Sequence, residues 1–240
     1  MQETTLHSEL KEIYRLEGGE AEMWVDGYLI DVVKPGLLIE IQTRHLGALK
    51  NKLEDLLDNH PIRLVHPIAL QKYIIVKTTD GKLISRRRSP KKGKIEDLFY
   101  ELVYIAKWVK HPNFSFEALL THEEEQRIQD GKGSWRRKGV SIQDRRLIRI
   151  IERRLFSNAN DYRLLLPATH VDPFTNQQLA NLLSIPHRLA SKMTYTLLQI
   201  GVLEIEGKQG RSYCFKMTSH DRRMINGRKN HPIPSIPRYQ

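Results

Sequence analysis

The sequence predicts an α/β protein: a mixed sheet in an α-β-β-β-α-β core, then an α-helical region, then a winged helix-turn-helix. Two observations predict this class. In residues 5–86, runs with helical spacing alternate with short strand-like runs that glycine-containing turns separate. In residues 175–217, two short helices precede a basic hairpin. The expected domains are a first domain at 1–110, a linker with a basic turn at 111–140, a winged-helix domain at 141–218 and a flexible basic tail at 219–240.

The N-terminal half should contain two amphipathic helices and several short strands. Asp26-Gly27, Lys34-Pro35-Gly36 and Asp80-Gly81 are turn signals between the strands. The first three strands form a meander and so pair antiparallel, whereas the helix after them allows a crossover back into the same sheet, which makes the sheet mixed. The predicted elements are a helix at 5–17, strands at 22–25, 28–33 and 37–42, a helix at 45–59, and strands at 63–68, 72–77 and 83–86.

The middle of the chain is predicted to be mostly helical. Ser141 is the expected N-cap of the last of these helices, with Asp144 at the capping-box position. The acidic run at residues 122–125 is expected to be a solvated face. Two interpretations of Trp135 stay open: it stacks on a base or ribose, or it is a buried anchor of its turn. The predicted elements are a helix at 95–109, a helix at 114–127, a basic glycine-rich turn at 130–139 and a helix at 141–156.

The C-terminal segment has the signals of a winged helix. Thr175 is the expected N-cap of a helix that ends at Leu183, and Gly201 ends a second helix over about 187–200. In a winged helix the second helix enters the major groove and the hairpin meets phosphate. The alternative is a module for dimerisation or protein docking. The expected DNA-binding residues are Arg188, Ser191, Lys192 and Tyr195 on the helix, and Lys208 and Arg211 on the wing.

The charge balance favours a polyanionic partner. Lysine and arginine total 39 against 28 acidic residues, and a formal net charge of +11 favours phosphate, because neutralising it releases counterions. The basic stretch at residues 86–94 is too charged to be buried. It is either a loop that contacts phosphate or a solvated charge run. Its expected DNA contacts are Arg86, Arg87, Arg88, Lys91 and Lys92.

Composition also narrows the class of protein. Cys214 is the only cysteine, which excludes an intrachain disulfide and a multi-cysteine zinc site. No apolar run reaches the roughly 20 residues that span a bilayer, and the first residues lack the pattern of a secretory signal. We expect a cytoplasmic protein with DNA, and no membrane, as its partner.

Three carboxylates lie at positions where burial of a charged side chain costs free energy. Asp31 and Glu40 each interrupt an apolar strand, and Glu9 lies within the apolar arc of the first helix. The alternative for Glu9 is a solvated acid at the edge of that helix. Strand alternation puts Gln42 on the same face as Glu40. Carboxylates that meet at one edge form a site for Mg²⁺, which completes its shell with water and a substrate phosphate.

At these residues the chain resembles the PD-(D/E)XK nuclease superfamily, whose restriction-endonuclease-like core carries an acid late in the second strand and Glu-x-Lys in the third. The matching residues are Asp31 and Glu40-Ile41-Gln42, and Glu9 matches the first-helix glutamate of Holliday-junction resolvase-like members. The resemblance covers about residues 1–78. It implies that Asp31 and Glu40 bind Mg²⁺ or Mn²⁺ with support from Glu9. The whole chain is also similar to an uncharacterised bacterial family with a C-terminal helix-turn-helix.

The departure from the superfamily is Gln42, where lysine is usual. Glutamine can orient the attacking water by a hydrogen bond, but it supplies no charge. A lysine from a neighbouring element could substitute, and Lys50, Lys52 and Lys72 are the candidates.

The resulting hypothesis is a magnesium-dependent DNA endonuclease acting in DNA repair or recombination. Nucleases of this kind often cut both strands as dimers, so a homodimer belongs to the expected assemblies. The rival hypothesis is a non-catalytic DNA-binding protein or transcriptional regulator on a degenerate nuclease fold. A third is a protein-docking adaptor.

Overall fold

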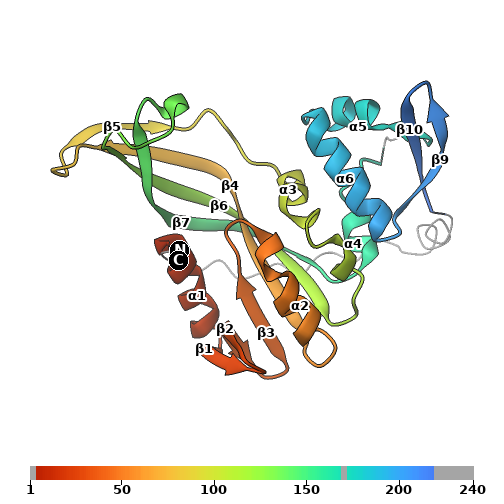
Figure 1. Ribbon diagram of the computed structural model, residues 1–240, viewed down its shortest axis with the longest axis horizontal. Coiled ribbons are helices and arrows are strands. Elements are labelled where there is room, and N and C mark those ends of the chain that lie inside the picture. The colour runs from red at the N-terminus through yellow and green to blue at the C-terminus, as the bar shows by residue number, and fades with distance from the viewer. Residues whose placement is uncertain (1–3, 169–171, 219–240) are drawn as a thin grey trace.

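The computed structural model describes residues 4–168 and 172–218 (Figure 1). The tail expected at 219–240 lies outside these residues. A seven-stranded mixed sheet has the order β1-β2-β3-β4-β6-β7, with β5 paired to β4, and a second, three-stranded sheet has the order β8-β10-β9. The strands of the large sheet are β1 (Glu20–Val25), β2 (Tyr28–Lys34), β3 (Leu37–Ile41), β4 (Ile62–Lys77), β5 (Leu83–Arg88), β6 (Phe114–Gln129) and β7 (Val140–Phe156).

The predicted α-β-β-β-α-β order is present at the start of the chain. Helix α1 (Thr5–Leu16) begins at Thr4, whose hydroxyl accepts the His7 N–H at 3.4 Å. Its buried face, which includes Leu6 and Leu10, packs on the sheet. The strands β1, β2 and β3 form the antiparallel meander, and β4 then pairs parallel with β3. The crossover between them contains the short 3₁₀ helix η1 (Leu46–Leu49) and α2 (Lys50–Leu56), which lie within the predicted helix at 45–59.

The two strands predicted at 63–68 and 72–77 are one long strand, β4. Its first half pairs with β3 as far as Val65, and its second half pairs with β5 from Tyr73 onward. A register shift between Ala69 and Gln71 against β6 marks the change of neighbour. The second half of β4 continues with β5, β6 and β7 into a long arm of the sheet (Figure 1).

The helices predicted at 114–127 and 141–156 are wrong: these residues form β6 and β7. Strand β6 lies between β4 and β7, so its apolar run is buried as a central strand. In β7, three register shifts against β6 interrupt the alternation of apolar and polar residues. As a result Ile148, Ile151 and Leu155 acquire helical spacing within an extended segment. The residues proposed as a linker and as the start of the winged helix therefore belong to the large sheet.

The apolar helix predicted at 95–109 is broken into short turns. They are η2 (Ile95–Leu98), α3 (Phe99–Leu102) and η3 (Ala106–Trp108). Their apolar residues share one buried cluster with helix α6 (His187–Gln199), to which both Phe99 and Met193 belong. Tertiary packing on both sides, rather than helix propensity, decides the conformation of this segment.

The C-terminal unit has the predicted order of helix, turn, helix and hairpin. Thr175 caps α5, and its hydroxyl accepts the Gln178 N–H at 3.3 Å. Gly201 follows α6 with a φ of +78°, as expected for a left-handed C-terminal residue. Lys94 joins this unit to the large sheet domain, because its Nζ donates to the carbonyl oxygens of Leu183 and Ser184 at 3.1 and 3.0 Å. The elements are α4 (Ala159–Arg163), β8 (Phe174–Thr175), α5 (Asn176–Leu183), α6 (His187–Gln199), β9 (Leu203–Gln209) and β10 (Ser212–Met217).

None of the helices formed by the described residues combines the length and the apolar composition needed to cross a membrane.

Candidate functional site

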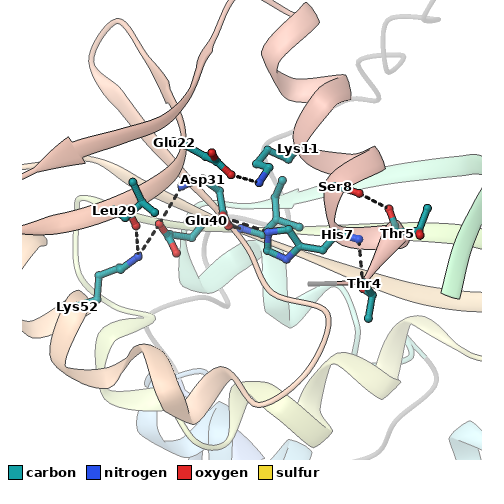
Figure 2. Close-up of polar contacts among 11 residues, drawn as sticks. Thr4, Thr5, His7, Ser8, Lys11, Glu22, Leu29, Asp31, Glu40 and Lys52 are labelled. Carbon is teal, nitrogen blue, oxygen red and sulfur yellow. Dashed lines mark hydrogen bonds and ion pairs between the residues drawn. The ribbon is translucent and has the colours of Figure 1, made fainter. Parts of the chain in front are cut away.

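Asp31 and Glu40 lie side by side on the neighbouring strands β2 and β3 (Figure 2). The register pairs Val32 with Ile39, which brings the next pair of residues, Asp31 and Glu40, opposite each other. The Asp31 N–H lies 3.4 Å from Glu40 Oε1, and Asp31 Oδ2 accepts the Ile41 N–H at 2.8 Å. Two carboxylates from separate apolar strands thus meet at one place.

Burial controls the charge of Glu40. The residue is only 5% exposed. Burial, and after it the negative charge of Asp31, raises the pKa of Glu40 to about 7, while the Lys52 ammonium opposes that rise. A further cation at this pair would favour the ionised form of both carboxylates.

Lys52 is the cation that the fold brings to Glu40. Helix α2 carries it, and its Nζ lies 2.9 Å from Glu40 Oε1 and 2.8 Å from the Leu29 carbonyl oxygen (Figure 2). Of the other two candidate lysines, Lys50 is exposed, and Lys72 donates to Glu125 at 3.0 Å. Of the three candidate lysines, Lys52 is therefore the one that contacts Glu40.

Gln42 makes its side-chain hydrogen bond to the loop that follows β3. Its Nε2 lies 3.4 Å from the His45 carbonyl oxygen, in the loop after β3. Strand β3 ends at Ile41, and Gln42 is the first residue after it, with its N–H donated to the Val65 carbonyl oxygen at 2.9 Å. The role of Gln42 in orienting water stays a prediction.

His7 is a site residue that the sequence reasoning missed. Its Nε2 lies 3.1 Å from Asp31 Oδ1 (Figure 2). Leu6 and Leu10 pack α1 on the sheet, so the position that follows Leu6 lies at the edge of the buried face. That placement beside a buried leucine was the available signal.

Glu9 does not join Asp31 and Glu40 in a three-ligand site. Its Oε2 accepts the Leu147 N–H of β7 at 2.6 Å, and the described residues contain no group of three or more His, Cys, Asp or Glu side chains that could hold a metal. Because α1 packs across β7 as well as β3, its carboxylate reaches a strand that the sequence placed in another domain. Glu9 thus fixes the position of α1.

We expect Glu9→Ala to lower the free energy of unfolding by about 1–3 kcal/mol, because the Leu147 N–H loses a charged acceptor. Chemical denaturation measures this loss. Glu9→Gln keeps an acceptor oxygen and should retain most of the stability. A variant as stable as the wild type would contradict the positioning role.

The remaining DNA-binding candidates lie in three places. Arg86 and Arg88 are exposed on β5, with their guanidinium groups 5.8 and 5.9 Å from the Tyr73 ring. Arg87 is exposed on the same strand, and Lys91 and Lys92 are exposed in the loop after it.

Tyr195 is exposed on α6, where the Ser191 hydroxyl donates to the His187 carbonyl oxygen at 3.1 Å. Lys208 and Arg211 lie at the β9–β10 hairpin, where Lys208 Nζ is 4.8 Å from the Tyr213 ring.

Burial decides the open alternative for Trp135 and shows that the prediction for the acidic run is wrong. Trp135 is 83% exposed with the Arg136 guanidinium 5.4 Å from its ring, so it is not a buried anchor. The acidic run on β6 is not a solvated face, because Glu123 and Glu125 are buried. Glu123 Oε2 accepts from Arg145 at 2.5 Å, so burial of these acids depends on arginine and lysine partners.

Residues 4–157 match the model of a family described as "Domain of unknown function (DUF8091)". An uncharacterised protein of Treponema pallidum (strain Nichols) is 33% identical over 157 residues, which are 65% of this chain. The matched region is 62% of the Treponema protein's own length. No solved structure matches the chain. The family match ends just after β7, which agrees with the extent of the large sheet.

Proposed function

The chain belongs to the DUF8091 family, and we propose that it is a magnesium-dependent endonuclease that hydrolyses phosphodiester bonds in DNA. The observation that carries this proposal is the cluster of Asp31, Glu40 and Lys52 on β2, β3 and α2. A nuclease of the PD-(D/E)XK type needs two carboxylates and one cation in this order of elements. Here the cation comes from the helix after β3 instead of from β3 itself.

The residues fit Mg²⁺ by their chemistry. Asp31 and Glu40 are hard oxygen donors, and Mg²⁺ in phosphate-processing sites is held by one or two carboxylates with water and substrate oxygens. Glu40 is desolvated and lies beside another negative charge, which a divalent cation would relieve. A bound Mg²⁺ would supply the site with an activated water and with charge stabilisation on the phosphate.

The residues of the chain have separate parts in this proposal. Lys52 stabilises negative charge on the attacked phosphate and holds Glu40 in place between turnovers. His7 orients Asp31 through its contact with Oδ1, while the Ile41 N–H holds Oδ2. The exposed arginines of β5 bring the phosphate backbone to the protein.

The direct ion pair between Lys52 and Glu40 favours a second candidate, a DNA-binding protein without catalysis on the same fold. In that candidate the lysine replaces the metal ion instead of assisting it. The charge of the chain, +11, supports DNA binding in both cases.

Nicking of supercoiled plasmid with Mg²⁺, with Mn²⁺ and with EDTA tests the proposal. We expect metal-dependent nicking that falls at least about 100-fold in Asp31→Asn and Glu40→Gln, because loss of even outer-shell partners costs 10- to 100-fold. Glu20→Gln on β1 is the matched control, since Glu20 is exposed. DNA binding should persist in all three variants. Equal nicking by all of them, or none by the wild type, would remove the endonuclease proposal.

A further inference from the structure

A cavity of about 510 Å³ separates α6 from two segments of the large sheet domain. Pockets that bind ligands have volumes of about 300–1,000 Å³, so this one is large enough for a nucleotide unit. Cationic and aromatic side chains from three segments meet there. The lining residues are His45, Gly47, Ala48, Tyr100, Glu101, Tyr104, Arg188 and Lys192.

The two α6 cations expected in a DNA major groove both line this cavity. Lys192 Nζ lies 3.4 Å from the Tyr100 carbonyl oxygen and 4.6 Å from the centre of the Tyr104 ring. Arg188, one helical turn before Lys192, is exposed at the mouth of the cavity. The N-terminal half of α6 thus faces the large sheet domain. Helix α3 of that domain packs directly against α6 (Figure 1).

This packing is unfavourable for duplex DNA. A major groove about 12 Å wide admits one helix. A duplex whose major groove contained Lys192 would also have to accommodate the Tyr104 side chain, because the Lys192 ammonium group lies over that ring. A single strand has no such width, and its bases are free to leave the stack.

We propose that the cavity binds one strand of single-stranded DNA, with a phosphate at Arg188 and Lys192 and a base on Tyr104. The Tyr104 side chain is 49% exposed although Lys192 Nζ lies over its ring, so part of the aromatic surface remains accessible to a base beside that ammonium group. Glu101 is the one carboxylate of the lining, and its Oε2 is occupied by the Leu46 N–H at 3.0 Å. Two cations therefore face one carboxylate that is held by the backbone.

The position of the cavity links it to the carboxylate pair. Ala48 lines the cavity, and Lys52, one helical turn later, contacts Glu40. Ala48 lies in η1 and Lys52 lies in the first turn of α2, and an α-helix advances about 5.4 Å per turn, so the two residues lie on adjacent turns. The inference rests on the proposed function and specifies its substrate as DNA with a single-stranded part next to the cleaved bond.

Binding of a fluorescein-labelled oligo-dT strand to the full chain in EDTA tests the cavity without cleavage. We expect the single strand to bind more tightly than a blunt duplex of equal length. Arg188→Ala and Tyr104→Ala should each weaken binding of the strand by about 10-fold, because stacking on one base and one phosphate contact have effects of that order. Tyr104→Phe keeps the ring and should bind like the wild type. Glu101→Gln keeps an acceptor for Leu46 and should bind several-fold more tightly.

The double variant Lys208→Ala/Arg211→Ala tests the rival winged-helix interface, since these two cations lie on the hairpin and not in the lining. We expect it to weaken binding of the single strand less than Arg188→Ala does. Preference for the duplex, with an equal loss in the hairpin variant and in Arg188→Ala, would overturn the proposal in favour of α6 in a major groove. Binding of neither DNA would overturn it as well.

The cavity proposal and the nuclease proposal can be contradicted independently of each other. Asp31→Asn should keep its affinity for the strand, so loss of cleavage with intact binding concerns only the catalytic pair. If the wild type does not bind the single strand and Arg188→Ala cleaves duplex DNA at the wild-type rate, only the cavity proposal is contradicted.

Discussion

Replacing Lys52 by methionine is expected to lower plasmid nicking by on the order of 10²–10³-fold at neutral pH, because one preorganised charge at the reacting phosphate is lost. The same change removes the group that opposes the raised pKa of Glu40. Glu40 would then take up a proton at neutral pH instead of staying buried with an uncompensated charge. The remaining activity should therefore need a higher pH than that of the wild type. Nicking rates over a pH series measure both effects.

Lys50→Met is the matched control for this prediction. Lys50 belongs to the same helix as Lys52 but is exposed, so its loss should change nicking by less than about 2-fold. Lys72→Met removes the third candidate lysine, which contacts Glu125 and not the carboxylate pair. A loss in Lys72→Met as large as that in Lys52→Met would show that the catalytic cation had been assigned to the wrong lysine.

The free energy of unfolding of the metal-free protein is expected to fall as the pH rises from about 4.5 to about 7, because folding raises the pKa of Glu40 over this range. Below this window Glu40 is protonated in both the folded and the unfolded chain. Within it, the unfolded chain loses its proton first, so the folded state is penalised, and above pH 7 the penalty is constant. A rise of the pKa from 4.5 to about 7 corresponds to about 3 kcal/mol in the free energy of unfolding.

Urea denaturation of the wild type and of Glu40→Gln across this pH range isolates the effect, because other titrating groups are common to both proteins. The difference between the two should change by up to about 3 kcal/mol and then level off. Mg²⁺ should restore stability to the wild type at pH 7 and above, where Glu40 can ionise, and should have little effect on Glu40→Gln. Parallel pH profiles for the two proteins would contradict the buried, proton-binding state of Glu40.

The carboxylate pair and its neighbours show how much of the candidate site can be predicted from the sequence. Asp31 and Glu40 were predicted to meet, because the short turn between β2 and β3 fixes the register of the hairpin. Lys52 was one of three lysines, and only the docking of α2 over the strands separates it from Lys50. His7 carried only a weak signal, since its contact with Asp31 depends on where α1 lies along the sheet.

The sequence by itself determined the features that depend on neighbours along the chain. The turn at Asp26-Gly27, the capping box of Thr175 and the glycine after α6 involve contacts within a few residues. Such contacts form without help from the rest of the molecule, so residue types alone specify them.

The tertiary structure alone decided what depends on partners far along the chain. Strand β6 is extended because it pairs with β4, and β7 because it pairs with β6. Glu9 bonds to a residue 138 positions away. The face of α6 that meets the large sheet domain is set by its packing on α3, which places Lys192 in the wall of a cavity. A local pattern of apolar residues is compatible with a helix or a strand, and burial against a distant partner selects between them.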